Sequence, residues 1–425
     1  MTRFLVCLLA PAALFGQTAP SHVLWDTDQI HTVRLTFTDP DWYNKLRANF
    51  EGKDDPDYME VDVEIGDRQF ARSGIRFKGN SSYNSYPGRK KSFKIKFDKY
   101  VKNSVYDGIS TINLNNAFKD PSFVREKVYY ELANSLSLAA PRVSYAALSI
   151  NGEYWGLYFL TEQVDKTLFT GRFGAEEDGN LFKGDPRGTL EYRGPDKAPY
   201  KENYELETNE KADDWSDLIE FIRVLNTTPP ADLPGAIEPL LDVEAVLSWL
   251  ALDNYTVNLD SYIGSGHNYY LYHRLSDNRF TPIPWDPNEA WGVFNMGRSI
   301  DQLTRLNRIF PEPPMPGRPL VTRLLSIPAY RERYMEKLKL LAEGAGHPDL
   351  LIARMNQLRD LIRDAVREDT KKMFTNQQFE DAMTVTVGQT PGPGQPPQPP
   401  GGGIPGGAIP GLETFLRARF TFLAQ

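Results

Sequence analysis

Cysteine is almost absent from this sequence, because Cys7 is the only one among 425 residues. It lies in an N-terminal apolar stretch, FLVCLLAPAALF, which follows Arg3 and precedes the small residues Gly16 and Ala19. A basic start, a short apolar run and small residues at its end are typical of a secretory signal peptide. We therefore predict a signal peptide over residues 1–19. The mature chain would then contain no thiol, which excludes disulfides, a cysteine nucleophile and cysteine-bound zinc.

The chain also lacks an excess of basic residues and, beyond its start, any long hydrophobic run. Its formal net charge is −8 and its pI is about 5.4, which argues against nucleic-acid binding by the chain as a whole. No later segment reaches the roughly 18 apolar residues of a membrane-spanning helix. We expect no transmembrane segment, and a secreted, periplasmic or cell-surface location.

Two common kinds of active site are missing as well. No G-x-S-x-G motif lies between a predicted strand and a predicted helix, as a serine hydrolase of the α/β type would require. His267 and His273 are close in sequence, but no further ligands with suitable spacing complete a zinc site.

The N-terminal part of the chain is predicted to be rich in strands. Apolar and polar residues alternate there, and a single apolar stripe predicts one prominent helix at residues 121–138. An Asn-Gly pair at 151–152 predicts a hairpin turn. The expected strands cover residues 32–37, 59–65, 69–78, 92–97, 144–150 and 154–161.

The remainder is predicted to be mainly helical, with a hairpin at 268–272 and 279–282. The expected helices cover residues 214–225, 243–258, 319–325, 329–341, 350–372 and 413–423. We therefore predict an α+β protein with a β-rich part over residues 20–174 and a mainly helical part over 175–386. The Pro/Gly-rich segment 387–411 is a loop or linker, and a helix within 412–425 packs back on the helical part.

Two carboxylates and an amide occur at the ends of predicted elements. Asp260 follows the helix predicted at 243–258, Asn268 begins the hairpin, and Asp286 follows its second strand. A phosphoryl-transfer site needs a base for the acceptor hydroxyl and oxygen ligands for magnesium. We predict that Asp260 is this base and that Asn268 and Asp286 bind the metal, with Asn288 as a further oxygen donor.

Two neighbouring residues have competing interpretations. Asp253 precedes Asp260 by two helical turns and competes for the role of base, but a position within the helix favours a supporting role. Trp285 could stack on a nucleotide base, although a core position is the commoner one for tryptophan.

A Gly-Asn-Ser-Ser turn that contains Asn80, Ser81 and Ser82 is followed by a lysine-bearing strand. The backbone N–H groups of such a turn can bind phosphate oxygens, although any β-hairpin also favours Gly and Asn at its tip. Lys94 or Lys96 would neutralise phosphate charge. Together with the oxygen ligands, these features predict an ATP site.

A helix carboxylate can position a nucleotide-binding lysine by pairing with it. Glu126 and Glu131 are both candidates, and we favour Glu131, because it lies one turn beyond Lys127 and beside the apolar stripe. Glu162 ends a strand just before a connecting segment, where backbone groups could contact adenine.

Several ordered motifs resemble those of the CotH kinases, which are secreted or spore-coat proteins with an atypical protein-kinase-like fold. The similarity extends over about residues 32–341, and the closing helix fits as well. The motifs are GIRFKGNSS, KKSFKIKF, VREKVYYELANSL, INGEYWGLYFLTEQVD, NLFKGD, HNYYLY and IPWD.

This resemblance implies a two-lobed kinase fold that uses ATP and Mg²⁺ or Mn²⁺ to phosphorylate serine, or threonine, of a protein. It also implies that Asp260 is the catalytic aspartate, that Asn268 and Asp286 bind metal, and that Lys94 or Lys96 is the nucleotide lysine. Glu131 would be the helix partner of that lysine.

The sequence also departs from the family pattern at two places. Asn288 stands where many members carry a second acid, which weakens one metal contact. Residues 264–266, Gly-Ser-Gly, lengthen the interval between Asp260 and Asn268. Two rival functions share the fold: a non-catalytic surface adhesion protein, and a kinase for a small molecule or glycan.

Overall fold

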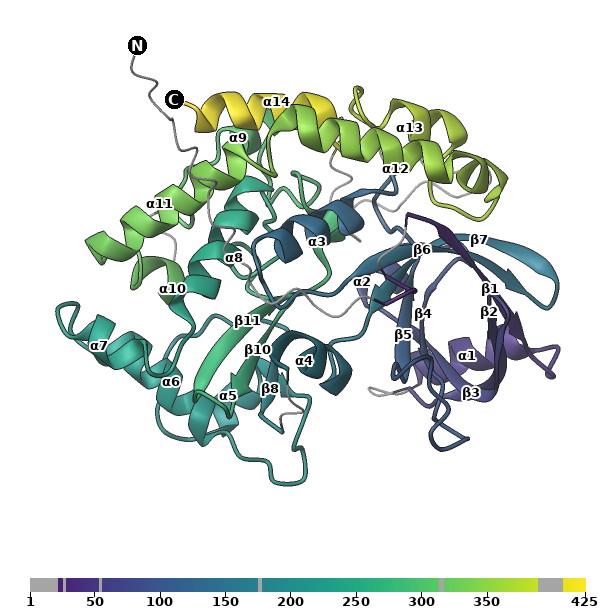
Figure 1. The fold of residues 1–425 in the computed structure, drawn as a ribbon, viewed down its shortest axis with the longest axis horizontal. Helices are drawn as coiled ribbons and strands as arrows, with labels where there is room; N and C mark the ends of the chain where they lie inside the picture. The colour runs from purple at the N-terminus through teal and green to yellow at the C-terminus, as the bar shows by residue number, and fades with distance from the viewer. Residues whose placement is uncertain (1–21, 26–27, 53–55, 175–177, 313–316, 389–407) are drawn as a thin grey trace, which may run out of the picture.

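A closed barrel of seven strands forms the N-terminal part of the protein (Figure 1). The structure is a computed structural model that describes residues 22–25, 28–52, 56–174, 178–312, 317–388 and 408–425. The predicted signal peptide therefore lies outside the described residues. The barrel strands are β1 (Ile30–Thr36), β2 (Met59–Ile65), β3 (Arg68–Lys78), β4 (Ser92–Lys96), β5 (Thr111–Asn115), β6 (Val143–Ile150) and β7 (Glu153–Glu162).

The barrel closes in the order β1-β2-β3-β4-β5-β7-β6, and a parallel pairing of β1 with β6 completes it. Closure leaves no unpaired strand edge. Alternation along β4 explains the two faces, because Phe93 and Ile95 are buried in the barrel core while Lys94 lies on the polar outer face. Helix α1 (Trp42–Glu51) packs its buried Trp42 and Leu46 into the same core.

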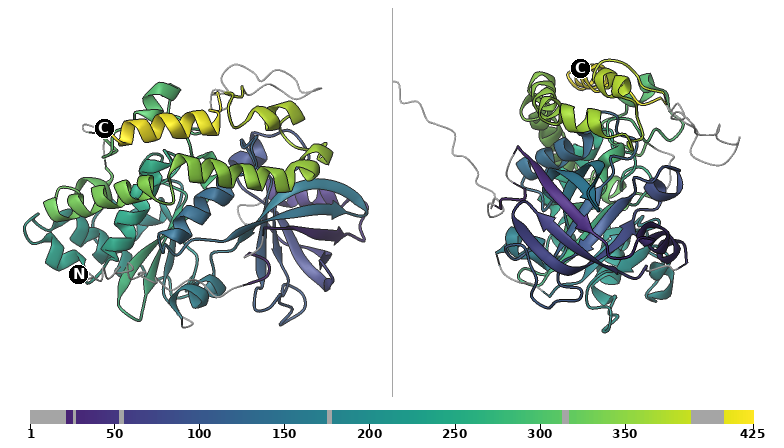
Figure 2. Two further views of the ribbon diagram at one scale, coloured as in Figure 1. Left: turned by 45° about the horizontal axis from the view of Figure 1, so that its top comes forward. Right: turned by 90° about the vertical axis from the view of Figure 1, so that its right-hand side faces the viewer.

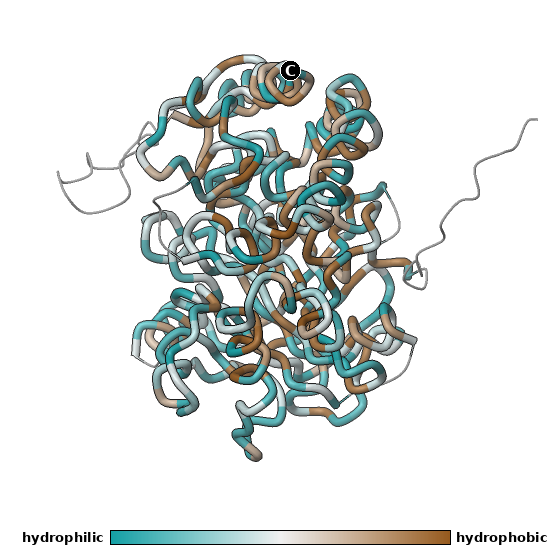
Figure 3. The backbone as a smooth tube through the Cα atoms, turned by 90° about the vertical axis from the view of Figure 1, so that its left-hand side faces the viewer, coloured by the Kyte–Doolittle hydropathy of each residue, from teal (hydrophilic) through white to brown (hydrophobic). Residues whose placement is uncertain are grey.

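The second part combines a four-stranded sheet with helices. The sheet has the order β11-β10-β8-β9 and consists of β8 (Leu181–Gly184), β9 (Tyr204–Leu206), β10 (Tyr269–Arg274) and β11 (Arg279–Pro284). The hydrophobic core around it includes residues of α3 (Arg125–Ser135), α6 (Ser216–Thr227), α8 (Val243–Tyr255) and α11 (Pro328–Glu343). Figure 3 shows hydrophobic segments crossing the interior of the molecule.

Shorter helices connect these elements. They are α2 (Ser81–Asn84), α4 (Lys166–Phe173), α5 (Ala198–Lys201), α7 (Leu233–Ile237), α9 (Ile300–Thr304), α10 (Pro319–Thr322), α13 (Asn376–Asp381) and the 3-10 helix η1 (Pro287–Glu289).

Two C-terminal helices form a layer across one side of the molecule (Figure 2). Helix α12 (Pro348–Glu368) contacts both β7 and α14 (Leu412–Leu423), so it joins the barrel to the helical part. Helix α14 buries Leu412, Phe415 and Leu416 in the main core. Most of the Pro/Gly-rich segment lies outside the described residues, but its two ends pair through a bridge between Val387 and Ile409.

The helix predicted at residues 121–138 is shorter in the structure. The chain first makes a tight turn in which Ala117, Lys119 and Phe123 have positive φ. Asp120 stabilises the end of this turn, because its carboxylate accepts hydrogen bonds from the backbone N–H groups of Ser122 and Arg125. Helix α3 therefore begins at Arg125.

The connection between β3 and β4 also differs from a simple hairpin. It runs through residues 79–91 and contains α2, so the Gly-Asn-Ser-Ser sequence begins a helical turn. Strands β5, β8 and β9 were not predicted. They are short, and β5 is buried at four of its five positions, which hides the alternation that identifies a strand.

One buried ion pair joins the barrel to the C-terminal layer. Lys90 Nζ lies 2.5 Å from Asp369 Oδ2, and neither side chain is exposed. Lys90 also donates to the carbonyl of Leu157 in β7, whose own N–H donates to Asp369. Gly156, with φ of 129°, allows this approach, because a Cβ there would lie 2.4 Å from the Asp369 carboxylate.

No helix among the described residues is both long and apolar enough to cross a membrane.

We expect Asp369→Asn to lower the free energy of unfolding by about 3–5 kcal/mol, because it leaves the buried Lys90 charge without its partner. Urea denaturation measures this change. Glu153→Gln is the control, since it removes a carboxylate that is 62% exposed and pairs with Lys371; it should cost less than about 1 kcal/mol. Equal effects of the two substitutions would contradict a structural role for the buried pair.

Candidate functional site

The loop that follows α8 brings Asp260 and Asn268 together. Asn268 Nδ2 donates to Asp260 Oδ2 at 3.1 Å and to the Asp260 carbonyl at 2.9 Å. His267 Nε2 lies 2.7 Å from the other carboxylate oxygen of Asp260. Two neighbouring side chains therefore fix the carboxylate of Asp260 in orientation.

The Gly-Ser-Gly insertion does not separate these residues. The N–H of Ser265 donates to the carbonyl of Leu259, and the N–H of Gly266 donates to the carbonyl of Ser261. Gly264 approaches Leu259 so closely that a Cβ would lie 2.0 Å from its carbonyl oxygen. The extra residues fold back on the loop, which leaves Asp260 in contact with Asn268.

Asp253 stabilises the start of this loop from within α8. It lies in α8 and is completely buried, where it accepts hydrogen bonds from the Tyr129 hydroxyl and the Asn258 side chain. Burial raises the pKa of Asp253 to about 7. Its position matches the supporting role that we favoured from the sequence.

The carboxylates around His267 change the pKa of its imidazole. Burial alone would lower its pKa, but the hydrogen bond to Asp260 and the charges of Asp260, Asp185 and Asp286 raise the pKa overall. The charge effect of Asp286 places that carboxylate in the same electrostatic environment as Asp260.

Asp286 follows β11 and lies beside Asn268. The register of β10 with β11 pairs Tyr269 with Pro284, and the N–H of Trp285 donates to the carbonyl of Asn268 at 3.1 Å. Asp286 has left-handed φ and ψ of 51° and 53°, and its N–H donates to the Tyr130 hydroxyl at 3.1 Å. A strained backbone of this kind is common at functional sites.

The Asp286 side chain remains exposed to solvent. Desolvation by the surrounding protein nevertheless raises the pKa of its carboxyl, and the charge of Asp260 raises this pKa further. The charges of Lys78, His267 and Lys183 lower it. An accessible carboxylate in this environment is suited to bind a cation.

Lys78 is a barrel lysine whose charge acts on Asp286. It ends β3, donates to Asn115 Oδ1 at 3.0 Å, and lies 4.9 Å from the centre of the Trp285 ring. Burial lowers the pKa of Lys78 to about 8, although the charges of Asp286 and Glu126 raise it. The sequence analysis missed Lys78, and its position directly before the glycine turn was the available signal.

Glu126, in the first turn of α3, is the helix carboxylate that belongs to this group. It is buried and accepts hydrogen bonds from Asn115 Nδ2 at 2.7 Å and Thr161 Oγ1 at 2.6 Å. Burial raises the pKa of Glu126 to about 7. Asn115 thus links the Lys78 amine to the Glu126 carboxylate.

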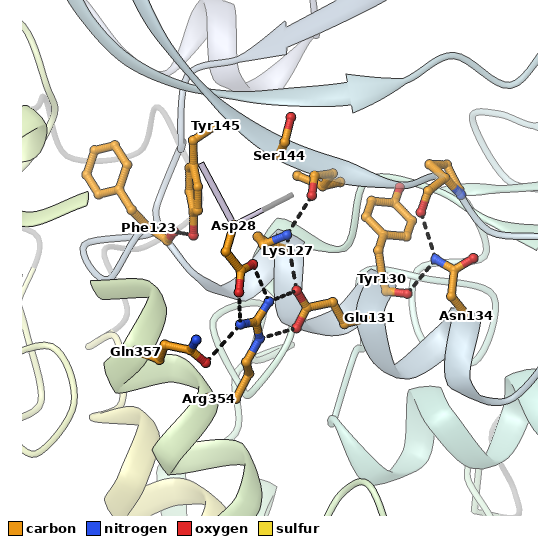
Figure 4. Close-up of polar contacts among 12 residues, drawn as sticks. Asp28, Phe123, Lys127, Tyr130, Glu131, Asn134, Ser144, Tyr145, Arg354 and Gln357 are labelled. Atoms are coloured by element: carbon orange, nitrogen blue, oxygen red, sulfur yellow. Dashed lines mark hydrogen bonds and ion pairs between the residues drawn. The ribbon is translucent and has the colours of Figure 1, made fainter. Parts of the chain in front are cut away.

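Glu131 lies elsewhere. It pairs with Arg354 of α12 at 2.7 Å and with Lys127 at 3.1 Å, and Arg354 also binds Asp28 (Figure 4). Our preference for Glu131 over Glu126 does not fit this geometry. The two glutamates are five residues apart, which is about 140° around a helix, so they cannot face the same site.

The two lysines predicted for the nucleotide have different surroundings. Lys94 pairs in register with Arg76 and lies on the same barrel face as Lys78. Burial and the charge of Arg76 lower the pKa of Lys94. Lys96 is more exposed and lies 3.9 Å from Asp98. Neither makes an ion pair with Glu126 or Glu131 in the described part of the chain.

The remaining residues predicted to bind the nucleotide make contacts with neighbouring protein groups. Asn80 accepts a hydrogen bond from Asn84, and Ser81 and Ser82 begin the short helix α2. Glu162 is buried and forms ion pairs with Arg142 and Arg172. These contacts account for Asn80 and Glu162 without a ligand.

Trp285 and Asn288 flank Asp286 on either side. Trp285 packs edge-on against Tyr270 and contacts Lys78 with its face. Asn288 is buried, and its side-chain nitrogen donates to the carbonyl of Phe118.

The next residue, Glu289, is a third carboxylate that the sequence analysis missed. It is buried and pairs with Lys119 at 2.9 Å. Burial raises its pKa to about 7, and the charges of Asp260 and Asp286 contribute to that rise.

The donor set fits a hard divalent cation. No group of three or more His, Cys, Asp or Glu side chains arranged for a metal occurs within the described residues. Asp286 and Asn268 instead offer one carboxylate and one amide, and Mg²⁺ commonly takes only one or two protein ligands, with phosphate oxygens and water as the others. These oxygen donors suit Mg²⁺ or Mn²⁺ better than softer metals.

Comparison with known proteins agrees with the motifs. The family described as CotH kinase protein matches residues 75–387, which include Lys78, Glu126, Asp260 and Asp286. The chain belongs to the CotH kinase family. The inner spore coat protein H of Bacillus subtilis (strain 168) is 31% identical over 303 residues, which cover 69% of this chain and 78% of that protein.

A second relative is more distant. The inner spore coat protein H-like protein of the same strain is 25% identical over 252 residues, covering 59% of this chain and 66% of that protein. The CotH match begins within β3, so β1, β2 and α1 lie outside it.

We expect Glu126→Gln to lower the pKa of Lys78 below its value of about 8, because burial of the ammonium would remain while a stabilising carboxylate is lost. An NMR pH titration of the protein with ¹³C-methylated lysines, with the Lys78 signal assigned by Lys78→Arg, measures this pKa. Glu131→Gln is the control and should leave it unchanged, since Glu131 pairs with Arg354. An unchanged pKa in Glu126→Gln would contradict the proposed coupling.

Proposed function

We propose that this CotH-family protein is an ATP- and divalent-metal-dependent kinase that phosphorylates serine or threonine of a protein. The observation that supports this most strongly is the contact of Lys78, from the barrel, with the Trp285 ring next to Asp286, whose charge acts on Lys78, beside the Asp260–Asn268 pair. In this proposal the barrel and the helical part correspond to the two lobes of a kinase. The nucleotide would bind between their facing polar residues.

Each residue of the group has a role that its environment favours. The Lys78 ammonium would stabilise the charge of the ATP phosphates, and its link to Glu126 through Asn115 would hold it in place. Asp286 and Asn268 would hold Mg²⁺ or Mn²⁺, which neutralises phosphate charge when bound. Phosphoryl transfer depends mainly on such positioning and charge stabilisation.

Asp260 would accept the proton of the acceptor hydroxyl. Asn268 and His267 each hold one of its carboxylate oxygens, so the group cannot rotate away from the position that the loop gives it. It is also only partly buried, so an acceptor side chain can reach it. Arg318 stabilises the loop further by donating to the carbonyls of Tyr262 and Gly264.

The names of the relatives support a proposal for where the protein acts. One relative is named as an inner spore coat protein, and the other is named as similar to that protein. We propose that this protein acts outside the cytoplasm, on a protein of a surface layer or on itself. A kinase for a small molecule or glycan would use the same residues, and a screen of acceptors separates these two classes.

We expect Asp260→Asn to reduce phosphate transfer roughly 10²–10⁴-fold, because an amide cannot accept the hydroxyl proton. Transfer from γ-labelled ATP to the protein itself and to added serine-containing proteins is the measurement. Asp178→Asn, at an exposed carboxylate paired with Lys166, is the matched control and should keep full activity. Equal incorporation by wild type and Asp260→Asn would rule out Asp260 as the base.

Heat stabilisation by ATP and Mn²⁺ separates the kinase from a non-catalytic adhesion protein. A kinase should be stabilised by the two together, and Asp286→Asn should abolish this effect while Asp260→Asn largely retains it. An adhesion protein would show neither stabilisation nor transfer.

A further inference from the structure

The segment that carries Asp286 is held by three contacts, two with the turn before α3 and one with α3 itself. The N–H of Asp286 donates to the hydroxyl of Tyr130 in α3. Asn288 donates to the carbonyl of Phe118 at 3.0 Å, and Lys119 pairs with Glu289 at 2.9 Å. All three contacts connect η1, or Asp286 directly before it, with residues 118–130.

The Lys119–Glu289 pair is the charged member of this set. The two side chains are only 8% and 4% exposed, so water does not screen their attraction. Lys119 sits at a positive φ of 54° within a turn that Asp120 stabilises from inside. The lysine therefore extends from a turn whose backbone is held by hydrogen bonds to Asp120.

Glu289 is a third carboxylate close to the two of the candidate site. It lies near enough to Asp260 and Asp286 for the three carboxylates to influence one another. Without Lys119, Glu289 would lose its buried partner and η1 would lose one of its contacts with residues 118–130, and Asp286 is three residues away on the same segment. The pairing both neutralises Glu289 and holds its backbone.

We propose that Lys119 and Glu289 are positioning residues, which hold Asp286 at a fixed place relative to Glu126 and Lys78. Residues 118–130, which include Glu126, thereby also hold the proposed metal ligand Asp286. The inference rests on the proposed function for the role of Asp286 as a metal ligand, but the fastening of the segment can be tested without a ligand.

Lys119→Met separates positioning from a simple charge effect, because the two predict opposite results. Loss of a positive charge near Asp286 would by itself strengthen binding of a cation. Loss of position should instead weaken Mn²⁺ binding, roughly 10–100-fold as for other residues that orient metal ligands. Lys119→Arg keeps the ion pair and should restore binding close to the wild-type affinity.

The experiment measures Mn²⁺ affinity by electron paramagnetic resonance, in the presence of a non-hydrolysable ATP analogue. Asp369→Asn is the matched control, since it also breaks a buried lysine–carboxylate pair; it should lower the melting temperature without changing Mn²⁺ affinity in the folded protein. Lys119→Gln also removes the ion pair with Glu289, and weaker Mn²⁺ binding is again expected in this variant if Lys119→Met does not fold.

Hydrogen exchange in the ligand-free protein tests directly whether Lys119 holds the segment that carries Asp286. Peptides that cover residues 286–291 should exchange faster in Lys119→Met and unchanged in Asp369→Asn. Unchanged exchange in Lys119→Met would overturn the inference, as would equal or tighter Mn²⁺ binding by that variant. If the wild type fails to bind Mn²⁺ with the analogue, the proposed function itself fails, and with it the role given to the pair.

Discussion

The ammonium group of Lys78 is the charge on which the site depends. It ends a barrel strand, yet it responds to Asp286, which belongs to the helical part. Partial burial makes its charged form costly, and two carboxylates compensate for this cost. A site that binds a triphosphate with a metal needs such a balance, because an isolated buried lysine would lose its proton and attract phosphate weakly.

Helix α3 connects the two sides of this arrangement. Its first turn provides Glu126, which reaches Lys78 through Asn115, and its next turn provides Tyr130, which binds the backbone of Asp286. On its other face, Glu131 binds Arg354 of the C-terminal layer. The orientation of one helix therefore sets the positions of a barrel lysine and of an aspartate far from it in sequence.

The sequence patterns indicate the grouping of the acidic residues of the candidate site better than the position of its lysine. Asp260, Asn268 and Asp286 each lie at the end of an element with a recognisable pattern, and antiparallel pairing of the hairpin brings Asn268 beside Trp285. Lys94 and Lys96 follow a clear strand pattern, but alternation identifies a face and not the position that reaches the opposite part. Lys78 shares that face, and only the fold shows that it contacts Trp285, next to Asp286.

The preference for Glu131 over Glu126 rested on its place one turn beyond Lys127 and beside the apolar stripe, and helical spacing alone does not show which face of α3 points toward the barrel lysine. The apolar stripe fits a helix from residue 121, whereas the positive-φ turn at 117–123 delays it to Arg125. The α+β class, the helical C-terminal part and the closing helix followed from periodicity, but closure of the barrel did not, because the parallel pairing of β1 with β6 is a long-range contact without a local signal.

The most direct test is a crystal structure of the protein with Mn²⁺ and a non-hydrolysable ATP analogue, in which the anomalous signal locates the metal. We predict Mn²⁺ bound directly to the carboxylate of Asp286, with Asn268 as a second ligand. The phosphates should lie against Lys78. Manganese bound away from Asp286, or phosphates held by Lys94 and Lys96 while Lys78 stays bonded only to Asn115, would contradict the account.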